Sequence, residues 1–295
     1  MPHLDLDDPR VPEGDVLDGA DGQDGTHEAF RLYYEVHGPT PGPDTATPVL
    51  LAHGAGGNAM SWWQQVPALA DRYPVITFDH RAFGRSPDIE DGPGRMAFGT
   101  DVRQLLDHLG LERVHFVGHS MGGRTAFGLL SRDPGRIASL TYSGTNGGCV
   151  DDRYREMKTA LEQDGTLAGP LLKRALAEGF GDANPEMRHL YMRIRSINPS
   201  RPRDFLKPTG RLVNYRGSTA QRLVDSGLPI LWIVGDHDRV VHPDLIRISH
   251  ELTPGSRLHL VEGAGHSAYF ERPEEWNRVV RGFLDEVEAG VGAAV

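Results

Sequence analysis

The sequence predicts an α/β fold in which a mainly parallel sheet is covered by helices on both faces. Short apolar runs of strand length alternate along the chain with amphipathic stretches of helix length. The last amphipathic stretch, residues 273–287, repeats its apolar side chains at the helical period and places Trp276, Val280 and Phe283 on one face. Strands that are separated by helices pair mainly in parallel, so the expected architecture has three layers.

The individual elements follow from the same patterns. Segments that are continuously apolar, or that alternate apolar and polar side chains, are predicted as strands at 30–36, 47–52, 74–78, 113–117, 137–142, 229–234 and 258–261. Segments with helical periodicity are predicted as helices at 61–70, 96–109, 121–131, 244–252 and 273–287.

The first 28 residues differ from the rest in composition. They hold nine acidic side chains and one basic one, and so supply -8 of the net charge of -10. They are rich in glycine and have few large apolar side chains, so burial cannot offset the entropy of ordering them. Residues 1–28 are therefore predicted to be a flexible acidic tail.

Residues 147–226 interrupt the alternation of strands and helices. They contain helix-like patterns without a convincing buried strand, and they lie between two predicted core strands. We interpret them as an inserted helical cap, with the core formed by 29–146 and 227–290. Between residues 151 and 225 there are fourteen basic and ten acidic side chains. This excess hints at an anionic substrate, although arginines on such helices are usually solvated surface.

Composition excludes several classes of function. No apolar run approaches the roughly 20 residues of a membrane-spanning helix, and the acidic start lacks the features of a secretory signal. The part after the tail is nearly neutral and has no basic stripe for nucleic acid. The single cysteine, Cys149, cannot form an intramolecular disulfide, which fits a reducing compartment. We therefore expect a cytoplasmic protein.

The motif with the most chemical content is GHSMG at residues 118–122, which follows a predicted strand and opens a predicted helix. Gly-x-Ser-x-Gly in this setting is typical of a nucleophile elbow, a sharp turn that holds a serine above the edge of the sheet. The glycines are needed because side chains there would collide with neighbouring backbone. The alternative is a plain glycine-rich turn, and the position between strand and helix favours Ser120 as a nucleophile.

A second glycine-rich segment, HGAGG at residues 53–57, follows another predicted buried strand. Acyl transfer needs two backbone N–H groups that face the oxyanion of the tetrahedral intermediate. We expect one from Met121, directly after the candidate nucleophile, and the other from Ala55. His53 is an alternative catalytic base, but a histidine in this position more often holds the loop by hydrogen bonds.

Candidates for the base and its acidic partner lie near the end of the chain. His266 lies in the small-residue turn GAGHS at the end of a predicted strand. It follows both the serine and the candidate aspartates in the chain, which gives the order Ser, Asp, His that is expected with a nucleophile elbow. Two aspartates follow the predicted strand 229–234, and the residues alone give only a weak preference between Asp236 and Asp238. Four other histidines lie within predicted strands (His115, His259) or helices (His108, His250) and are expected to be structural or solvent-facing.

Together these motifs resemble the α/β-hydrolase superfamily with a helical cap, the group that includes small esterases, enol-lactonases, haloperoxidase-like perhydrolases and carbon–carbon bond hydrolases. The resemblance runs from about Phe30 to Leu284. It also includes the stretches FDHRAFGRSP (78–87) and GAGHSAYFERPEEWN (263–277). It implies an α/β-hydrolase fold with a cap; the cap matches by position only, so no cap residue is assigned a role.

The resemblance also implies the roles of the site residues. In the family the acid ends a Gly-x-x-Asp pattern, which selects Asp238 over Asp236. The remaining positions match Ser120 as nucleophile, His266 as base, and the amides of Ala55 and Met121 as oxyanion donors.

The function implied is a serine hydrolase that cleaves a carboxylic ester or lactone of a small molecule through an acyl-enzyme. One alternative is a carbon–carbon bond hydrolase acting on a vinylogous diketone. Another is a ligand-binding receptor that keeps the triad but turns over weakly, because fold and triad do not fix function. No metal or other cofactor is expected, since the sequence has no ligand cluster and no dinucleotide or phosphate-loop motif. Oligomeric state is not predicted.

Overall fold

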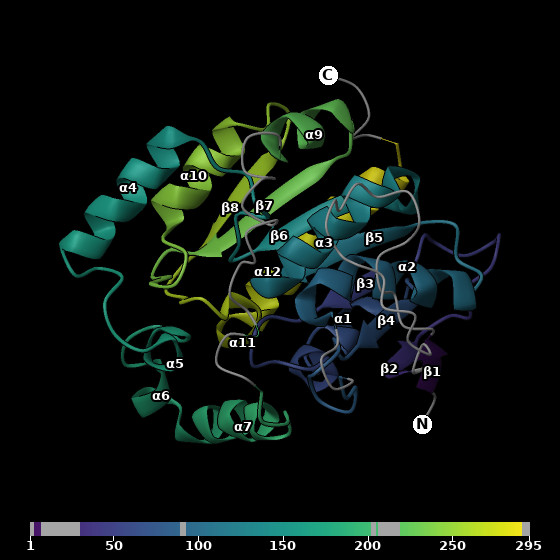
Figure 1. The fold of residues 1–295 in the computed structure, drawn as a ribbon, viewed down its shortest axis with the longest axis horizontal. Helices are drawn as coiled ribbons and strands as arrows, with labels where there is room; N and C mark the ends of the chain where they lie inside the picture. The colour runs from purple at the N-terminus through teal and green to yellow at the C-terminus, as the bar shows by residue number, and fades with distance from the viewer. Residues whose placement is uncertain (1–2, 7–29, 89–92, 202–204, 206–218, 291–295) are drawn as a thin grey trace, which may run out of the picture.

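The structure is a computed structural model that describes residues 3–6, 30–88, 93–201, 205 and 219–290. Its centre is an eight-stranded sheet in the order β1-β2-β4-β3-β5-β6-β7-β8 (Figure 1). The strands are β1 (His3–Leu6), β2 (Phe30–His37), β3 (Val49–Ala52), β4 (Val75–Phe78), β5 (Val114–His119), β6 (Ile137–Ser143), β7 (Ile230–Gly235) and β8 (Arg257–Val261). Strands β3 to β8 pair in parallel, whereas β2 is antiparallel to both β1 and β4.

The strand predictions from sequence are confirmed, with one strand missed. All seven predicted strands are present within about three residues of their expected limits. The missed strand, β1, lies inside the segment expected to be a flexible tail. It pairs with the first half of β2 from His3–Tyr33 to Leu6–Phe30, so at these four residues the expectation was wrong. The alternating pattern HLDL is only four residues long and lies in an acidic segment, which makes it a weak strand signal. The rest of the tail, 7–28, lies outside the described residues.

Two hydrophobic cores cover the two faces of the sheet. Adjacent strand residues alternate between them, so that Leu50 belongs to one core and Leu51 to the other. The first core is completed by α2 (Phe98–His108), α3 (Met121–Arg132), α9 (Thr219–Asp225) and α10 (Pro243–Glu251). The second is completed by η1 (Ala59–Trp62), α1 (Val66–Leu69), α11 (Ala268–Glu271) and α12 (Pro273–Glu288). Two short turns, η2 (Gly94–Ala97) and η3 (Pro134–Arg136), precede α2 and β6.

The helix predicted at 61–70 is wrong as a single element. The structure has the 3₁₀ turn η1, then a break, then the single turn α1. Asn58 caps η1 through its side chain, which fixes an earlier start than predicted. Pro67 lies in the first turn of α1, where its missing N–H needs no helical partner, and this position explains why the second turn starts there.

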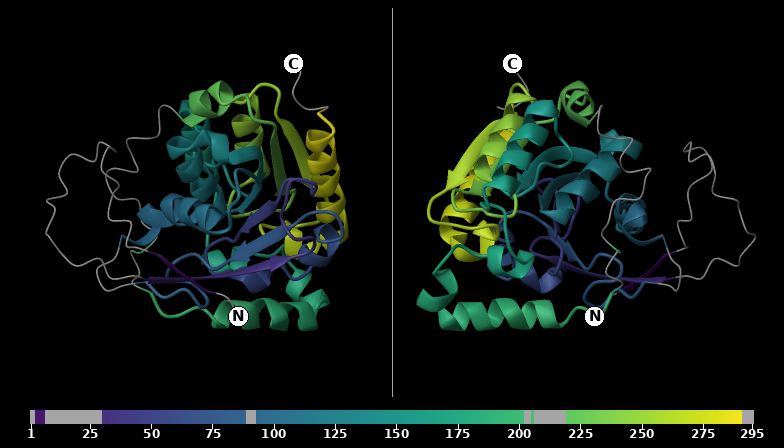
Figure 2. Two further views of the ribbon diagram at one scale, coloured as in Figure 1. Left: turned by 90° about the vertical axis from the view of Figure 1, so that its right-hand side faces the viewer. Right: turned by 60° about the vertical axis from the view of Figure 1, so that its left-hand side comes forward.

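The segment between β6 and β7 is helical over its described residues, but its helices lie in three places (Figures 1 and 2). Helix α4 (Asp152–Gln163) packs beside α10, and α9 packs on the core. Helices α5 (Leu171–Arg174), α6 (Phe180–Ala183) and α7 (Pro185–Ser196) lie at the opposite end of the molecule, where α7 contacts η1. Within the described ranges, α5 to α7 and the residues directly after α7 approach the loops that follow β3, β5 and β8.

The loops after β7 and β8 are bonded to each other. The N–H of Asp236 donates to the carbonyl of Val261, and the N–H of His237 donates to that of Ala264 (3.1 and 2.9 Å). A Cβ on Gly235 would lie 2.2 Å from the oxygen of Ala264, so only glycine permits this approach. The two loops are thereby held side by side at the carboxyl edge of the sheet. None of the helices in the described ranges is both long and apolar enough to span a bilayer.

Candidate active site

Ser120 occupies a strained turn between β5 and α3. Its φ of 51° is positive, which among the described residues other than glycine is shared only by Ala82. The N–H of Ser120 donates to the carbonyl of Ser143 at the end of β6 (2.9 Å), which fixes the turn to the sheet. The close packing explains the flanking glycines, because a Cβ at Gly118 would lie 2.7 Å from the carbonyl of Gly122. The geometry is that of the predicted elbow.

His266 and Asp238 are brought together by the bonded loops after β7 and β8. Nδ1 of His266 donates to Oδ2 of Asp238 at 2.8 Å, and both side chains are buried. The other carboxylate oxygen, Oδ1, accepts the N–H groups of Val240 and Val241 at 2.7 and 2.9 Å. Each oxygen thus has at least one donor, which fixes the orientation of the carboxylate. A donated hydrogen on Nδ1 leaves Nε2 of the neutral imidazole as an acceptor.

Asp236, the competing aspartate, does not contact His266. Its carboxylate lies 4.0 Å from the exposed ring of His237, and its Oδ1 is buried without a hydrogen-bond partner among the described residues. Of the two aspartates, Asp238 is the one whose side chain is hydrogen-bonded to His266.

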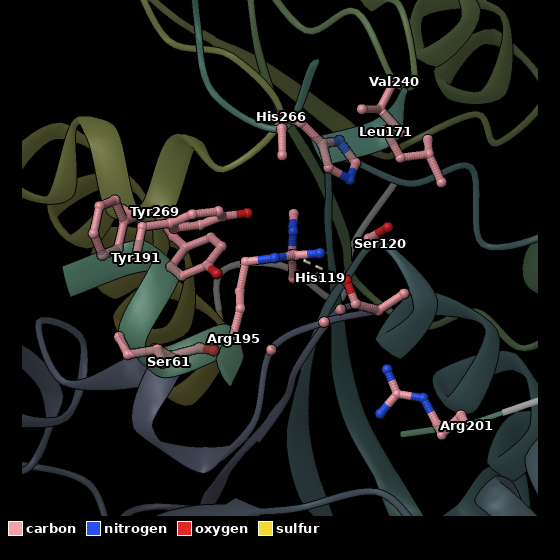
Figure 3. A pocket seen from close by; sticks show the side chains of 17 residues that line it. Ser61, His119, Ser120, Leu171, Tyr191, Arg195, Arg201, Val240, His266 and Tyr269 are labelled. Atoms are coloured by element: carbon pink, nitrogen blue, oxygen red, sulfur yellow. Dashed lines mark hydrogen bonds between the residues drawn. The ribbon is translucent and has the colours of Figure 1, made fainter. Parts of the chain in front are cut away.

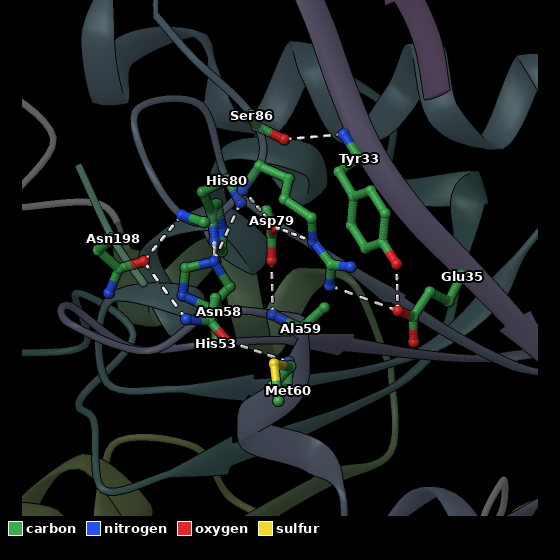
Figure 4. Close-up of polar contacts among 12 residues, drawn as sticks. Tyr33, Glu35, His53, Asn58, Ala59, Met60, Asp79, His80, Ser86 and Asn198 are labelled. Carbon is green, nitrogen blue, oxygen red and sulfur yellow. Dashed lines mark hydrogen bonds and ion pairs between the residues drawn. The ribbon is translucent and has the colours of Figure 1, made fainter. Parts of the chain in front are cut away.

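His53 holds the glycine-rich loop and does not line the pocket (Figure 4). Its Nδ1 lies 2.9 Å from the carbonyl of Gly54, and its Nε2 accepts the N–H of His80 at 3.0 Å. Complete burial lowers the pKa of His53 to about 3, so the ring is neutral. These contacts agree with the loop-holding interpretation and leave no ring nitrogen for a reacting group.

The same loop is tied to the segment that follows α7. Asn198 donates from Nδ2 to the carbonyl of Gly56 at 2.8 Å. Its Oδ1 accepts the N–H of Gly84, also at 2.8 Å (Figure 4). Asn58, next to the loop, donates to the carbonyl of Ile194 within α7, also at 2.8 Å. Helix α7 is therefore anchored over residues 54–57.

A cavity of about 270 Å³ lies between these elements (Figure 3). Ser120, His266 and Ala55 all line it, whereas Met121, the first residue of α3, is not among its lining residues. His119 packs behind His266 with ring centroids 4.8 Å apart, and burial together with the nearby His266 holds its pKa well below the ordinary value. A small cavity with a serine hydroxyl and an imidazole in its wall is suited to a small-molecule substrate.

A sequence model of the family described as "alpha/beta hydrolase fold" matches residues 47–273, which is more than half of the chain. The chain belongs to the α/β-hydrolase family. The carbamate hydrolase RutD of Azorhizobium caulinodans, whose curated name is qualified as putative, is 30% identical over 87% of this chain and 96% of its own. The 3-oxoadipate enol-lactonase 1 of Acinetobacter baylyi is 25% identical, over 84% and 92% respectively.

Solved structures of hydrolases are also similar to this chain. A thermophilic esterase from Thermogutta terrifontis, determined with malate bound, superposes with a TM-score of 0.71 at 26% identity, covering 90% of this chain and 97% of its own. Est816, described as an N-acyl homoserine lactone degrading enzyme, gives a TM-score of 0.66 at 25% identity, covering 86% and 97%. The fold and these named hydrolases identify the chain as an enzyme.

Sequence reasoning missed most of the pocket wall of this α/β hydrolase. The additional lining side chains come from α5 to α7 and the segment after them, from the loop after β7, from η1 and from α11: Leu171, Ala175, Tyr191, Ile194, Arg195, Arg201, Val240, Ser61, Tyr269 and Phe270. The motif stretch around His266 already contained Tyr269 and Phe270, so these two could have been found. Within the described ranges there is no group of three His, Cys, Asp or Glu side chains arranged to hold a metal.

Proposed function

We propose that this α/β hydrolase cleaves a small carboxylic ester or lactone through a Ser120–His266–Asp238 triad and an acyl-enzyme. The observation that carries the proposal is the 2.8 Å hydrogen bond from His266 to Asp238 behind a cavity that Ser120 and His266 share. A buried carboxylate on Nδ1 holds the imidazole in the tautomer whose Nε2 accepts a proton. Relatives named as esterase and lactonase support the same acyl chemistry.

The first half of the reaction forms the acyl-enzyme. Nε2 of His266 takes the hydroxyl proton of Ser120 while Oγ attacks the carbonyl carbon, and Asp238 stabilises the imidazolium without becoming protonated. The negative charge on the carbonyl oxygen is accepted by the backbone N–H groups of Ala55 and Met121, each worth about 10²- to 10³-fold in rate. His266 then returns the proton to the leaving alcohol, or to the ring oxygen of a lactone.

The second half hydrolyses the acyl-enzyme. A water molecule gives its proton to Nε2 of His266 and attacks the ester carbon on Ser120. Collapse of the second tetrahedral intermediate releases the carboxylic acid and restores the serine hydroxyl. Helices α5 to α7 act as a cap in this proposal, because they close one side of the cavity and limit the water that reaches it.

A substrate panel tests the proposal. The purified protein is assayed with p-nitrophenyl esters of two to eight acyl carbons, with γ- and δ-lactones, and with a vinylogous diketone from aromatic ring cleavage. We expect ester or lactone turnover that disappears in a Ser120→Ala protein prepared in the same way. Accumulation of a dienoic acid, without turnover of any ester or lactone, would instead assign a carbon–carbon bond hydrolase.

A further inference from the structure

The wall of the cavity has a strongly one-sided charge. Its lining residues include two arginines, Arg195 and Arg201, and contain no aspartate or glutamate among the residues that the structure describes. In Figure 3 the Arg195 side chain extends into the middle of the pocket, and Arg201 lies on another side of it. Two cations therefore line the cavity that the candidate nucleophile Ser120 also lines.

Arg195 lies flat against the glycine-rich loop. A Cβ at Gly56 would be 2.4 Å from each of its Cζ, Nη1 and Nη2 atoms, so the guanidinium occupies the space that a side chain at residue 56 would fill. Its hydrogen bond is a long one, from Nη1 to the carbonyl of Ala55 (3.4 Å), and its Cζ lies 5.5 Å from the ring centre of Tyr191. No carboxylate within the described part of the chain pairs with it.

Arg201 is half-buried, as Arg195 is, and it too has no acidic partner among the described residues. Its Nη1 donates to the carbonyl of Ala82 at 2.8 Å, and its guanidinium stacks on Phe83, 3.7 Å from the ring centre. Burial and the charge of Arg195 lower the pKa of Arg201 to about 10, so it remains protonated at neutral pH. A planar cation with unused N–H groups thus lies against the pocket.

A buried cation without a counter-ion is costly, and elsewhere in the described part of the chain a buried arginine is paired. Arg81, which is fully buried, forms two bonds of 2.8 and 2.7 Å to the carboxylate of Asp101. With no carboxylate among the described residues beside it, Arg201 is desolvated and repelled by Arg195, which an anion from outside would relieve. Guanidinium groups match the two oxygens of a carboxylate with parallel N–H bonds.

We propose that Arg195 and Arg201 bind a free carboxylate of the substrate, so that the enzyme is selective for small esters or lactones that carry a second, ionised carboxyl group. This substrate class rests on the proposed acyl hydrolysis at Ser120. The cavity of about 270 Å³ is close to the lower limit of usual ligand pockets and favours short-chain acids.

A matched pair of esters tests the selectivity. Monoethyl glutarate carries the carboxylate, and ethyl 5-amino-5-oxopentanoate replaces it with an uncharged carboxamide of the same shape. We expect the wild-type kcat/KM to be about 10- to 100-fold higher for the carboxylate, the value of one or two charge-assisted hydrogen bonds. Arg195→Gln and Arg201→Gln should each lower this ratio by about tenfold or more, and Arg195→Lys should lower it less.

Arg193→Gln is the control, because Arg193 is on the same helix but is exposed and outside the pocket. Its ratio should equal that of the wild type. A wild-type preference for the carboxamide, or a ratio that Arg195→Gln and Arg201→Gln leave unchanged, would overturn the selectivity. In that case hydrolysis of both esters would still support the acyl hydrolase itself.

Protection of Ser120 provides a second measurement that needs no turnover. Glutarate and glutaramide compete with a fluorescent alkyl phosphonate for the serine of the full-length wild-type protein. We expect glutarate to slow labelling at concentrations at which glutaramide does not, and the Arg195→Gln/Arg201→Gln protein to lose this difference. Equal protection by both compounds would contradict the carboxylate site, and absence of labelling in all proteins would contradict the hydrolase proposal.

Discussion

Oδ2 of Asp238 accepts a hydrogen bond from Nδ1 of His266, while Oδ1 of the same carboxylate is held by two backbone N–H groups. The aspartate is therefore oriented by its own turn, and the histidine is oriented by the aspartate. Asp236, two residues earlier, has neither contact. Because these neighbouring aspartates differ in their contacts, substituting each of them in turn tests the proposed triad.

Asp238→Asn is expected to lower turnover by roughly 10⁴-fold, because an amide donor opposite Nδ1 favours the imidazole tautomer that cannot accept the serine proton. Asp236→Asn should cost far less, since its carboxylate does not contact His266. Both variants are measured on one ester under the same conditions. A larger loss at Asp236 than at Asp238 would show that the acid is misassigned.

The close packing of the elbow against β3 predicts how a substitution at Gly122 changes the stability of the protein. A Cβ on Gly122 would lie 2.2 Å from the carbonyl oxygen of Ala52, which is backbone at the end of β3 and cannot move aside. Gly122→Ala is therefore expected to destabilise the protein by several kcal/mol, about the scale of a severe overpacking. Urea unfolding at constant pH measures the change.

Gly128 is the matched control, on the same helix α3. The nearest atom to a Cβ there is the Cα of Gly99 at 3.4 Å, an ordinary contact. Gly128→Ala should be neutral or stabilise the protein by about 0.5–1 kcal/mol through helix propensity. If both alanines destabilise alike, the close approach of the elbow to β3 is not what requires Gly122.

Glu271 connects the His266 loop to the helical segment above it. Its Oε1 accepts the N–H of Gly265 at 3.0 Å, and its Oε2 accepts that of Ala177 at 2.7 Å. Burial raises the pKa of this carboxyl from 4.5 to about 7, in spite of the two donors. Between these pH values the folded protein keeps a proton that the unfolded chain releases.

The stability contributed by protonated Glu271 is therefore complete below pH 4.5 and is lost as the pH rises to about 7. Glu271→Gln does not titrate, so the free energy of unfolding of the wild type minus that of the variant should fall by up to about 3 kcal/mol across this window. Urea unfolding of both proteins at intervals from pH 4 to 8 gives the difference. A difference that rises with pH would mean that the two N–H donors outweigh burial.

Much of the fold and of the candidate triad could be predicted from sequence because the signals are local. Buried strands are short apolar runs, and the turns that carry Ser120 and His266 need small residues next to the functional side chain. The choice of Asp238 over Asp236 was harder to predict from the sequence, because it depends on how far the turn carries each carboxylate. The family pattern selected it, and the contact with His266 agrees.

The residues of the pocket wall could not be predicted from the sequence, because they meet only through contacts between distant parts of the chain. Arg195 approaches Gly56 across 139 residues of chain, and the periodicity of α7 shows which faces are apolar but not what they contact. The basic excess of residues 151–225 was visible in the sequence. Only the structure separates the two arginines in the cavity from an exposed one such as Arg193. The strand β1 was missed because four alternating residues are a weak signal within an acidic segment.

Ser120→Ala should lower turnover by on the order of 10⁶-fold, the loss found where a triad acts as a unit. The fold should be retained, because the substitution removes one hydroxyl and adds no atom to a crowded turn. Activity and thermal unfolding are measured on the same preparation. Residual activity above about one percent would mean that another residue is the nucleophile.

Covalent labelling tests the central claim most directly, since it depends on the nucleophile and not on the choice of substrate. The full-length protein is treated with an alkyl fluorophosphonate, digested, and its peptides are identified by mass spectrometry, with Ser120→Ala and His266→Gln treated alongside. We expect one phosphonylated residue, Ser120, in the wild type, no adduct in Ser120→Ala, and labelling slowed by several orders of magnitude in His266→Gln. An adduct on a different residue, or labelling that is unchanged in Ser120→Ala, would contradict the account.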